Sequence, residues 1–263
     1  MRSLLEQFPK LLIGVVHLRP LPGSPRWEGD FESVIDSAVR DARAYESGGA
    51  HALFIENFGD IPFTKGCVAP ETVAAMAAAG RAVRAAVKLP IGFNVLRNDA
   101  RTALALCAAC RGGFIRVNVH TGAMLTDQGV IEGNAYETLR YRHRVCPKAQ
   151  IFADVHVKHA VPFPNWTIED AARDTVERGL VDALIVSGKG TGLQTDLLDV
   201  QKVRRTCPAV KILLGSGVTA ANARDYLPVA DGFIVGSSLK IDGQVANPVD
   251  PKRVAALARV VQG

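Results

Sequence analysis

Two short segments near the C-terminus combine glycines with hydroxyl side chains, a composition suited to binding an anion. They are Gly215-Ser216-Gly217 and Gly236-Ser237-Ser238, and each follows a short apolar run. Glycine lets backbone N–H groups approach a phosphate without a Cβ atom in the way. We therefore predict a phosphate site at these two segments. The alternative interpretation is that the glycines only allow tight turns.

A third glycine-rich segment, residues 187–192, lies upstream of these two and carries Lys189 with two hydroxyl groups. We expect its Gly190 and Gly192 to assist in holding the same anion. The segment lacks the glycine spacing of a nucleotide-binding P-loop, so the sequence gives little support to a nucleoside triphosphatase.

The run Phe152–His159 brings three titratable groups together at alternate positions, Asp154, His156 and Lys158. In a strand this spacing sends all three to one face, and His159 to the other. We expect Asp154 and Lys158 to lie at one site and to interact. Burial could lower the Lys158 pKa enough for base or Schiff-base chemistry, or the two could form a purely structural ion pair.

Further polar residues end other apolar runs and complete a candidate site. Glu56 and Asp154 are candidate general acids or bases, and Lys158 and Asn118 could stabilise negative charge on an enolate-like intermediate. His17 joins them as a fifth candidate catalytic residue. His17, Glu56, Asp154 and His156 could instead bind a metal, but no close ligand pair is present, and we predict neither a metal nor a cofactor.

Residues 121–133 follow a run that contains Arg116, Asn118 and His120 at alternate positions. This long, glycine-containing segment is expected to form a mobile lid over the site, and a packed surface loop is the alternative.

These residues need a scaffold that brings strand ends together. Eight short apolar runs alternate with segments of helical periodicity, a pattern typical of parallel strands with crossover helices. The predicted strands are Leu11–His17, Ala52–Glu56, Ile91–Val95, Phe114–Val119, Ile151–Val157, Ala183–Ser187, Lys211–Leu214 and Gly232–Val235. We predict that residues 1–263 form a single-domain (β/α)₈ barrel of the α/β class, with an open doubly wound sheet as the alternative.

Composition excludes several other classes of protein. The net charge is +5, but Lys and Arg are scattered, so we expect no nucleic-acid partner. The five cysteines are irregularly spaced, which argues against a disulfide framework, and no apolar run is long enough to span a membrane. We expect a cytoplasmic protein without membrane insertion, and homo-oligomerisation is left open.

Several longer strings resemble the BtpA/SgcQ family across nearly the whole chain. The strings are Gly14-Val-Val-His17, Glu56-Asn-Phe-Gly-Asp60, Asn94-Val-Leu-Arg-Asn-Asp99, Phe114-Ile-Arg-Val-Asn118, Thr126-Asp-Gln-Gly129, Asp154-Val-His-Val-Lys158 and the two glycine–serine segments. The resemblance implies a barrel of the ribulose-phosphate-binding type without a defined reaction. One branch of that family is named for photosystem I biogenesis, and another lies among sugar-metabolism proteins.

The predicted function is that of an enzyme acting on a small phosphorylated metabolite of the sugar-phosphate type, as an isomerase, epimerase or aldolase-type lyase. The rival hypothesis is a non-catalytic assembly factor for a membrane complex. A scaffold has little need for polar groups that converge on one point, whereas an enzyme requires them.

Overall fold

Eight parallel strands close into a barrel in which neighbours along the chain are also neighbours in the sheet, and the last strand pairs with the first. The computed structural model describes residues 3–188 and 190–263. In chain order the barrel strands are β1 (Leu11–His17), β2 (Ala52–Glu56), β3 (Ile91–Asn94), β4 (Phe114–Val117), β7 (Gln150–Val155), β9 (Ala183–Val186), β10 (Lys211–Leu214) and β11 (Gly232–Val235). The predicted (β/α)₈ barrel is confirmed, and an open sheet is excluded.

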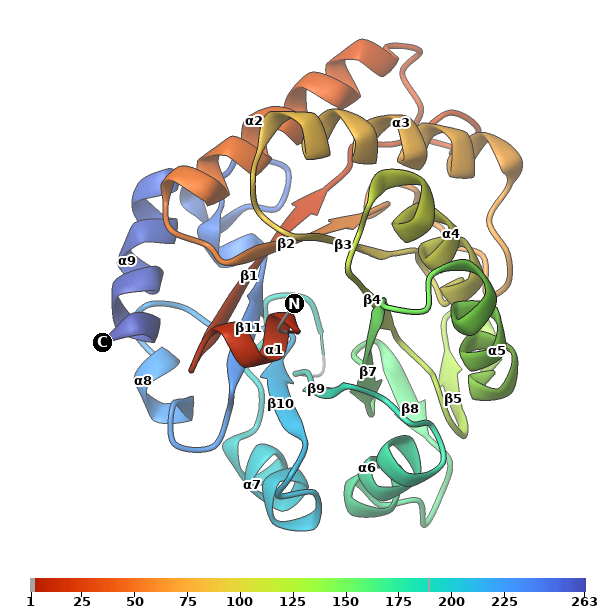
Figure 1. Cartoon of the computed structure of the whole chain (residues 1–263), viewed down its shortest axis with the longest axis vertical. Coiled ribbons are helices and arrows are strands. Elements are labelled where there is room, and N and C mark those ends of the chain that lie inside the picture. The colour runs from red at the N-terminus through yellow and green to blue at the C-terminus, as the bar shows by residue number, and fades with distance from the viewer. Residues whose placement is uncertain (1–2, 189) are drawn as a thin grey trace.

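Helices surround the barrel on its outside, as Figure 1 shows. They are α2 (Phe31–Ser47), α3 (Pro70–Ala86), α4 (Ala100–Cys110), α5 (Ala135–Val145), α6 (Ile168–Glu177), α7 (Leu197–Thr206), α8 (Ala223–Tyr226) and α9 (Pro251–Gln262). Short polar side chains accept hydrogen bonds from the first-turn N–H groups of several helices. Thr167 caps α6 and Asp250 caps α9.

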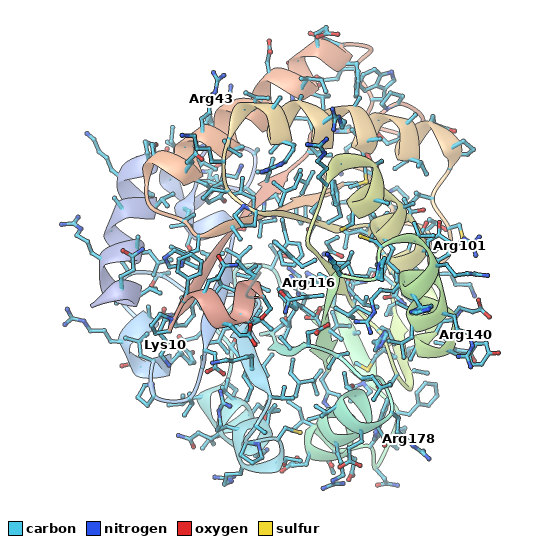
Figure 2. The ribbon with its side chains drawn as sticks, in the orientation of Figure 1. Lys10, Arg43, Arg101, Arg116, Arg140 and Arg178 are labelled. Carbon is cyan, nitrogen blue, oxygen red and sulfur yellow. The ribbon has the colours of Figure 1, made fainter. Side chains whose placement is uncertain are left out.

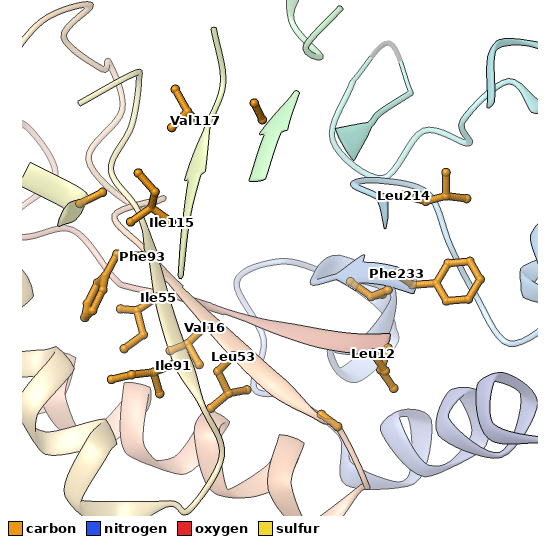
Figure 3. Packing of buried hydrophobic residues seen from close by; sticks show 14 of the residues in the cluster. Leu12, Val16, Leu53, Ile55, Ile91, Phe93, Ile115, Val117, Leu214 and Phe233 are labelled. Atoms are coloured by element: carbon orange, nitrogen blue, oxygen red, sulfur yellow. The ribbon is translucent and has the colours of Figure 1, made fainter. Parts of the chain in front are cut away.

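Alternation along each strand divides the apolar core into two layers. Along β1, Leu12 and Val16 point outward and belong to the cluster between the strands and the helices. Figure 3 shows this outer layer, in which Leu53 and Ile55 lie beside Val16. The inward positions form a second cluster within the barrel, to which β1 contributes Leu11, Ile13 and Val15.

The inner layer changes from apolar to polar along the strands. Phe54, Phe114 and Phe152 pack against one another inside the barrel, with Phe114 and Phe152 stacked at a centroid separation of 5.4 Å. Two residues further along the same three strands stand Glu56, Arg116 and Asp154. Because successive inward positions are two residues apart, the polar ring at the C-terminal end follows directly from the strand register.

The first helix closes the opposite end of the barrel. The short helix α1 (Leu4–Gln7) precedes β1, and its Leu4 and Leu5 are buried within the inner cluster. In Figure 1 it lies over the centre of the ring of strands. The N-terminal end of the barrel is therefore sealed by apolar side chains.

A small antiparallel sheet interrupts the alternation of strands and helices. The segment after β4 forms a hairpin of β5 (Ala123–Thr126) and β6 (Gly129–Glu132), and β5 also pairs with β8 (Ala160–Pro162). This is the glycine-containing segment for which the sequence predicts a lid. It has strands of its own because Met124 and Ile131 pack against Val119 and Val157.

Candidate functional site

A cavity of about 500 Å³ lies at the C-terminal end of the barrel, where sequence reasoning places the site. Glu56, Arg116, Lys158 and His17 line one part of it, and the exits of β10 and β11 line the other. The remaining lining residues include Thr191, Gly192, Arg253 and the two glycine–serine segments. The charged groups and the glycine-rich turns therefore share one cavity.

Arg116 and Asp154 form a buried ion pair at the wall of this cavity. Two hydrogen bonds of 2.8 and 2.7 Å join the guanidinium Nε and Nη2 atoms to the two carboxylate oxygens. Asp154 also accepts from the Asn118 amide at 3.1 Å and from the Ser187 hydroxyl at 2.8 Å. Burial alone would lower the Arg116 pKa, but Asp154 raises it overall.

This pairing corrects the expected partnership of Asp154 with Lys158. Both residues lie at the barrel mouth, but within the described part of the chain the ion-pair partner of Asp154 is Arg116, and no Lys158 ion pair of 4.0 Å or less is present. Arg116 lies within the ring of strands in Figure 2, whereas Arg43, Arg101, Arg140 and Arg178 lie at the periphery. The position of Arg116 was predictable, because it lies two residues after Phe114 and therefore on the same inner face of β4.

Glu56 is the carboxylate that remains open to the cavity. It is 4% exposed and accepts a hydrogen bond of 2.7 Å from the Asn94 amide through Oε2. Asp154, in contrast, already accepts four hydrogen bonds at its two oxygens. Of the two candidate acid–base residues, Glu56 therefore has the freer carboxylate.

Lys158 lines the cavity without being part of a strand. The strand β7 ends at Val155, and His156 has a positive φ of 51°, so alternation does not continue to Lys158. Burial lowers the Lys158 pKa below its ordinary value, and Arg116 lowers it further, whereas Glu56 and Asp154 oppose this. Arg97, which the sequence reasoning missed, donates from Nη2 to the Lys158 carbonyl.

The break after Val155 also changes the positions of the two histidines near Lys158. His156 lies 6.3 Å from the Trp166 ring, centroid to centroid, and is not among the residues that line the main cavity. His159 contacts Thr191 in the glycine-rich segment 187–192, the loop after the sixth barrel strand (below, the sixth loop), with 3.0 Å between its Nε2 and the hydroxyl. The expected shared face of Asp154, His156 and Lys158 is therefore wrong for His156, because the backbone leaves the extended conformation there.

The regular alternation of side chains also stops at the end of strand β4. The strand ends at Val117, and the Asn118 amide still reaches Asp154. His120, however, places its Nε2 2.9 Å from the Gly179 carbonyl oxygen, outside the cavity. Only Arg116 from this set lines the main cavity.

His17 occupies the last inward position of β1 and lies beside Gly236, which follows the neighbouring strand β11. A Cβ atom on Gly236 would lie 2.5 Å from the His17 Cε1 atom. Burial holds the His17 pKa well below 6.5, with further contributions from Lys240, Lys158 and Arg116. The imidazole is therefore neutral at pH 7, and its Nδ1 atom is buried without a hydrogen-bond partner in the described residues.

The exits of β10 and β11 carry the predicted phosphate donors. The Ser216 hydroxyl is committed to the Gly190 and Leu193 carbonyls at 2.9 Å each, and the Ser238 hydroxyl to the Val218 carbonyl at 2.6 Å. The Gly215 N–H donates to Val186 at 2.9 Å. These groups build the turns and are not free for an anion.

Other groups at the same two exits are available to a ligand. Within the described ranges, the N–H groups of Ser216, Gly217, Ser237 and Ser238 donate to no protein acceptor, nor does the Ser237 hydroxyl. Gly192 lines the cavity from the sixth loop, whereas Gly190 contributes its carbonyl to Ser216, and Lys189 lies outside the described residues. Phosphate binding by these residues stays a prediction.

The charge presented to the cavity is mainly positive. Arg116, Lys158 and Arg253 line it together with one carboxylate, Glu56. The acidic partners of the two arginines, Asp154 and Asp250, are outside the lining. No cluster of three or more metal-ligating side chains occurs among the residues that the structure describes, and none of their helices is long and apolar enough to cross a membrane.

Comparison with known proteins places this architecture in a family. The model of the BtpA family matches residues 9–263. An uncharacterized protein of Pyrococcus furiosus is 48% identical over 97% of this chain and 96% of its own length. The photosystem I biogenesis protein BtpA of Synechocystis sp. is 45% identical, covering 93% of this chain and 85% of its own, and the sgc region protein SgcQ of Escherichia coli is 36% identical over 94% and 92%.

Solved structures with low sequence identity share the fold. Tryptophan synthase of Mycobacterium tuberculosis superimposes with a TM-score of 0.66 at 16% identity, covering 99% of this chain and 97% of that one. Phosphoribosyl anthranilate isomerase of Thermus thermophilus gives a TM-score of 0.58 at 13% identity, with coverage of 95% and 97%.

Proposed function

The chain belongs to the BtpA family, and on that premise we propose that it is an enzyme acting on a small phosphorylated metabolite of the sugar-phosphate type. The observation that carries this proposal is the single cavity that joins free backbone N–H groups to a buried carboxylate and a buried amine. The reaction class is proton transfer at carbon, as in an isomerase, epimerase or aldolase-type lyase.

The phosphate end of the ligand is proposed to lie at the exits of β10 and β11. The N–H groups of Ser216, Gly217, Ser237 and Ser238 supply the hydrogen bonds, and Arg253 lines the same part of the cavity. Hydrogen bonds to a charged acceptor contribute about 1.5 to 3 kcal/mol each. In barrels, the loops after the seventh and eighth strands commonly bind phosphate.

The reacting end of the ligand is proposed to lie against Glu56 and Lys158. Glu56 moves the proton, because its carboxylate is open to the cavity and is oriented by Asn94. Lys158 opposes the negative charge that develops on the substrate. Asp154 and Asn118 hold Arg116 and one another in place, and His17 packs beside the phosphate-binding exits.

Names of the compared proteins are consistent with this proposal. One of the solved barrels is an isomerase of phosphoribosyl anthranilate. The proposal places the enzyme in the cytoplasm and requires no nucleic acid, membrane insertion or cofactor.

The substitution Ser237→Asp tests the phosphate site. Gly236 is a poor position for this purpose, because any side chain there would strike His17. Ser237 already has a Cβ atom, and its hydroxyl is not engaged by the described protein. A carboxylate at this position should repel the anion and weaken binding of inorganic phosphate and glycerol 3-phosphate by at least about tenfold, or 1.4 kcal/mol.

Calorimetric titration measures this affinity, and circular dichroism checks the fold. The matched control is Ser237→Ala, which keeps the N–H group and adds no charge, and should weaken binding far less. Unchanged phosphate affinity in folded Ser237→Asp would show that the anion site lies elsewhere.

The second candidate function is that of an assembly factor, favoured by the name of the Synechocystis relative. A scaffold would not depend on the charges inside the barrel. Loss of the protein's biological function in a Glu56→Gln variant that still folds and binds phosphate would support an enzyme. Retention of that function would support an assembly factor.

A further inference from the structure

We propose that the Lys158 side-chain amine is a nucleophile that condenses with the carbonyl carbon of the bound ligand to form an imine. The inference rests on the proposed function, because it assigns covalent chemistry to the same cavity. It also narrows the substrate class to phosphorylated aldehydes and ketones.

The surroundings of Lys158 differ from those of Lys240, a lysine that is fully buried. Lys240 is 2% exposed and pairs directly with the Asp41 carboxylate, with 2.5 Å between Nζ and Oδ2. Lys158 lines the cavity and makes no ion pair or side-chain hydrogen bond within the described residues. A buried lysine that lacks a carboxylate partner is poorly suited to holding charge and well suited to offering a free amine.

Two guanidinium groups add to this effect. Arg116 lines the same cavity, and Arg97 bonds the Lys158 carbonyl oxygen. Asp154 is engaged by Arg116, so it does not bond the lysine. Burial and Arg116 both lower the Lys158 pKa, which increases the neutral fraction of the amine.

The chemistry is balanced without an oxidant or a metal. The Nζ lone pair attacks the carbonyl carbon, and the carbonyl oxygen takes up a proton from solvent while Glu56 takes the proton that the attacking nitrogen loses, which gives a carbinolamine. Glu56 returns this proton to the hydroxyl, which leaves as water, and a protonated imine remains. The positive imine nitrogen then accepts electron density when a neighbouring C–H or C–C bond breaks, as isomerases and aldolases require.

The proposed phosphate site and Lys158 share one cavity, so a single ligand can reach both. The glycine–serine exits and Lys158 line the same space of about 500 Å³. A ligand held at one end by its phosphate can therefore place a carbonyl group at the lysine. Anchoring at one end also raises the effective concentration of the carbonyl at the amine.

Reductive trapping tests the inference. The protein is incubated at pH 7 with glycolaldehyde phosphate or dihydroxyacetone phosphate and treated with borohydride. Intact-mass and peptide measurements should show one adduct, equal to the ligand mass less one oxygen atom, on Lys158. Excess inorganic phosphate should suppress the adduct, and glycolaldehyde without phosphate should label Lys158 at least tenfold less.

Lys158→Arg is the matched variant, because it keeps a cation but cannot form an imine. It should lose the adduct while retaining phosphate affinity. Phosphate binding in the wild-type protein without an adduct on Lys158 from either probe would overturn the inference and leave the proposed function standing. Failure of phosphate to bind would overturn the proposed function itself.

Discussion

His17 is a neutral, buried titratable group whose charge state bears on stability. The unfolded chain binds a proton at this histidine near its ordinary pKa of 6.5, and the folded chain does so only at much lower pH. Protonation therefore favours the unfolded state as the pH falls below 6.5. The stabilisation is present above pH 6.5 and is lost with acidification.

We expect His17→Phe to be less sensitive to acid than the wild-type protein. The variant keeps a planar ring beside Phe58, which lies 4.6 Å from His17 between ring centroids. Each proton taken up on unfolding costs up to about 1.4 kcal/mol per pH unit. Urea unfolding between pH 7 and 5 should show a shallower decline in the variant, and equal slopes would contradict the assigned burial of His17.

Residue positions on the strands were predictable from the sequence, and those beyond strand ends only in part, since Lys158 and Asn118 lie at the site but His156 does not. Alternation correctly placed Glu56 and Asp154 on the inner face, since both lie within strands. It failed for His156, where the backbone changes to a positive φ. The choice of Arg116 over Lys158 as the partner of Asp154 depends on three-dimensional distances that the sequence does not contain.

At the scale of elements, the hairpin of β5 and β6 requires glycine at position 122, directly before β5. Gly122 has a positive φ of 63°, and a Cβ atom there would lie 1.4 Å from the Trp166 ring. Gly129, in the turn of the same hairpin, has a φ of 88° with nothing within 4 Å of its Cβ position. The two glycines share a left-handed backbone conformation, which a residue with a Cβ atom rarely adopts, but they differ in packing.

We expect Gly122→Ala to destabilise the protein more than Gly129→Ala. Both substitutions cost about 1–2 kcal/mol for the left-handed backbone, and the first adds about 1–3 kcal/mol of overpacking. Chemical denaturation of both variants measures the difference. Equal losses would show that Trp166 moves aside without cost.

The hairpin itself was not predicted, although its residues were singled out. Glycines and polar residues in 121–133 indicated a loop, because four-residue strands are too short to show alternation clearly. The eight barrel strands were predicted to within two residues because each is a buried apolar run followed by a helical segment.

At the scale of the whole molecule, one ion pair links the first and last parts of the chain. Lys240, after β11, bonds Asp41 of α2, and Asp41 also accepts from the Val249 N–H at 3.1 Å. The link lies beside the contact of α9 with α2. It supports the closure of the barrel between β11 and β1.

We expect Asp41→Asn to lower the free energy of unfolding by about 3–5 kcal/mol, because it leaves the Lys240 charge buried without a partner. Asp199→Asn is the matched control, since the Asp199–Lys202 pair is solvent-exposed and should change stability little. Thermal and urea unfolding measure the loss of stability in each of the two variants. A small effect of Asp41→Asn would mean that water reaches Lys240.

The sealed N-terminal end of the barrel determines how ligands enter and leave the cavity. Leu4 and Leu5 of α1 fill the barrel interior below the cavity together with Phe54, Phe114 and Phe152. A molecule that enters the cavity must therefore depart through the opening by which it arrived. Substrate and product would use the same opening and the same site. The product of any reaction in this barrel should therefore act as a competitive inhibitor.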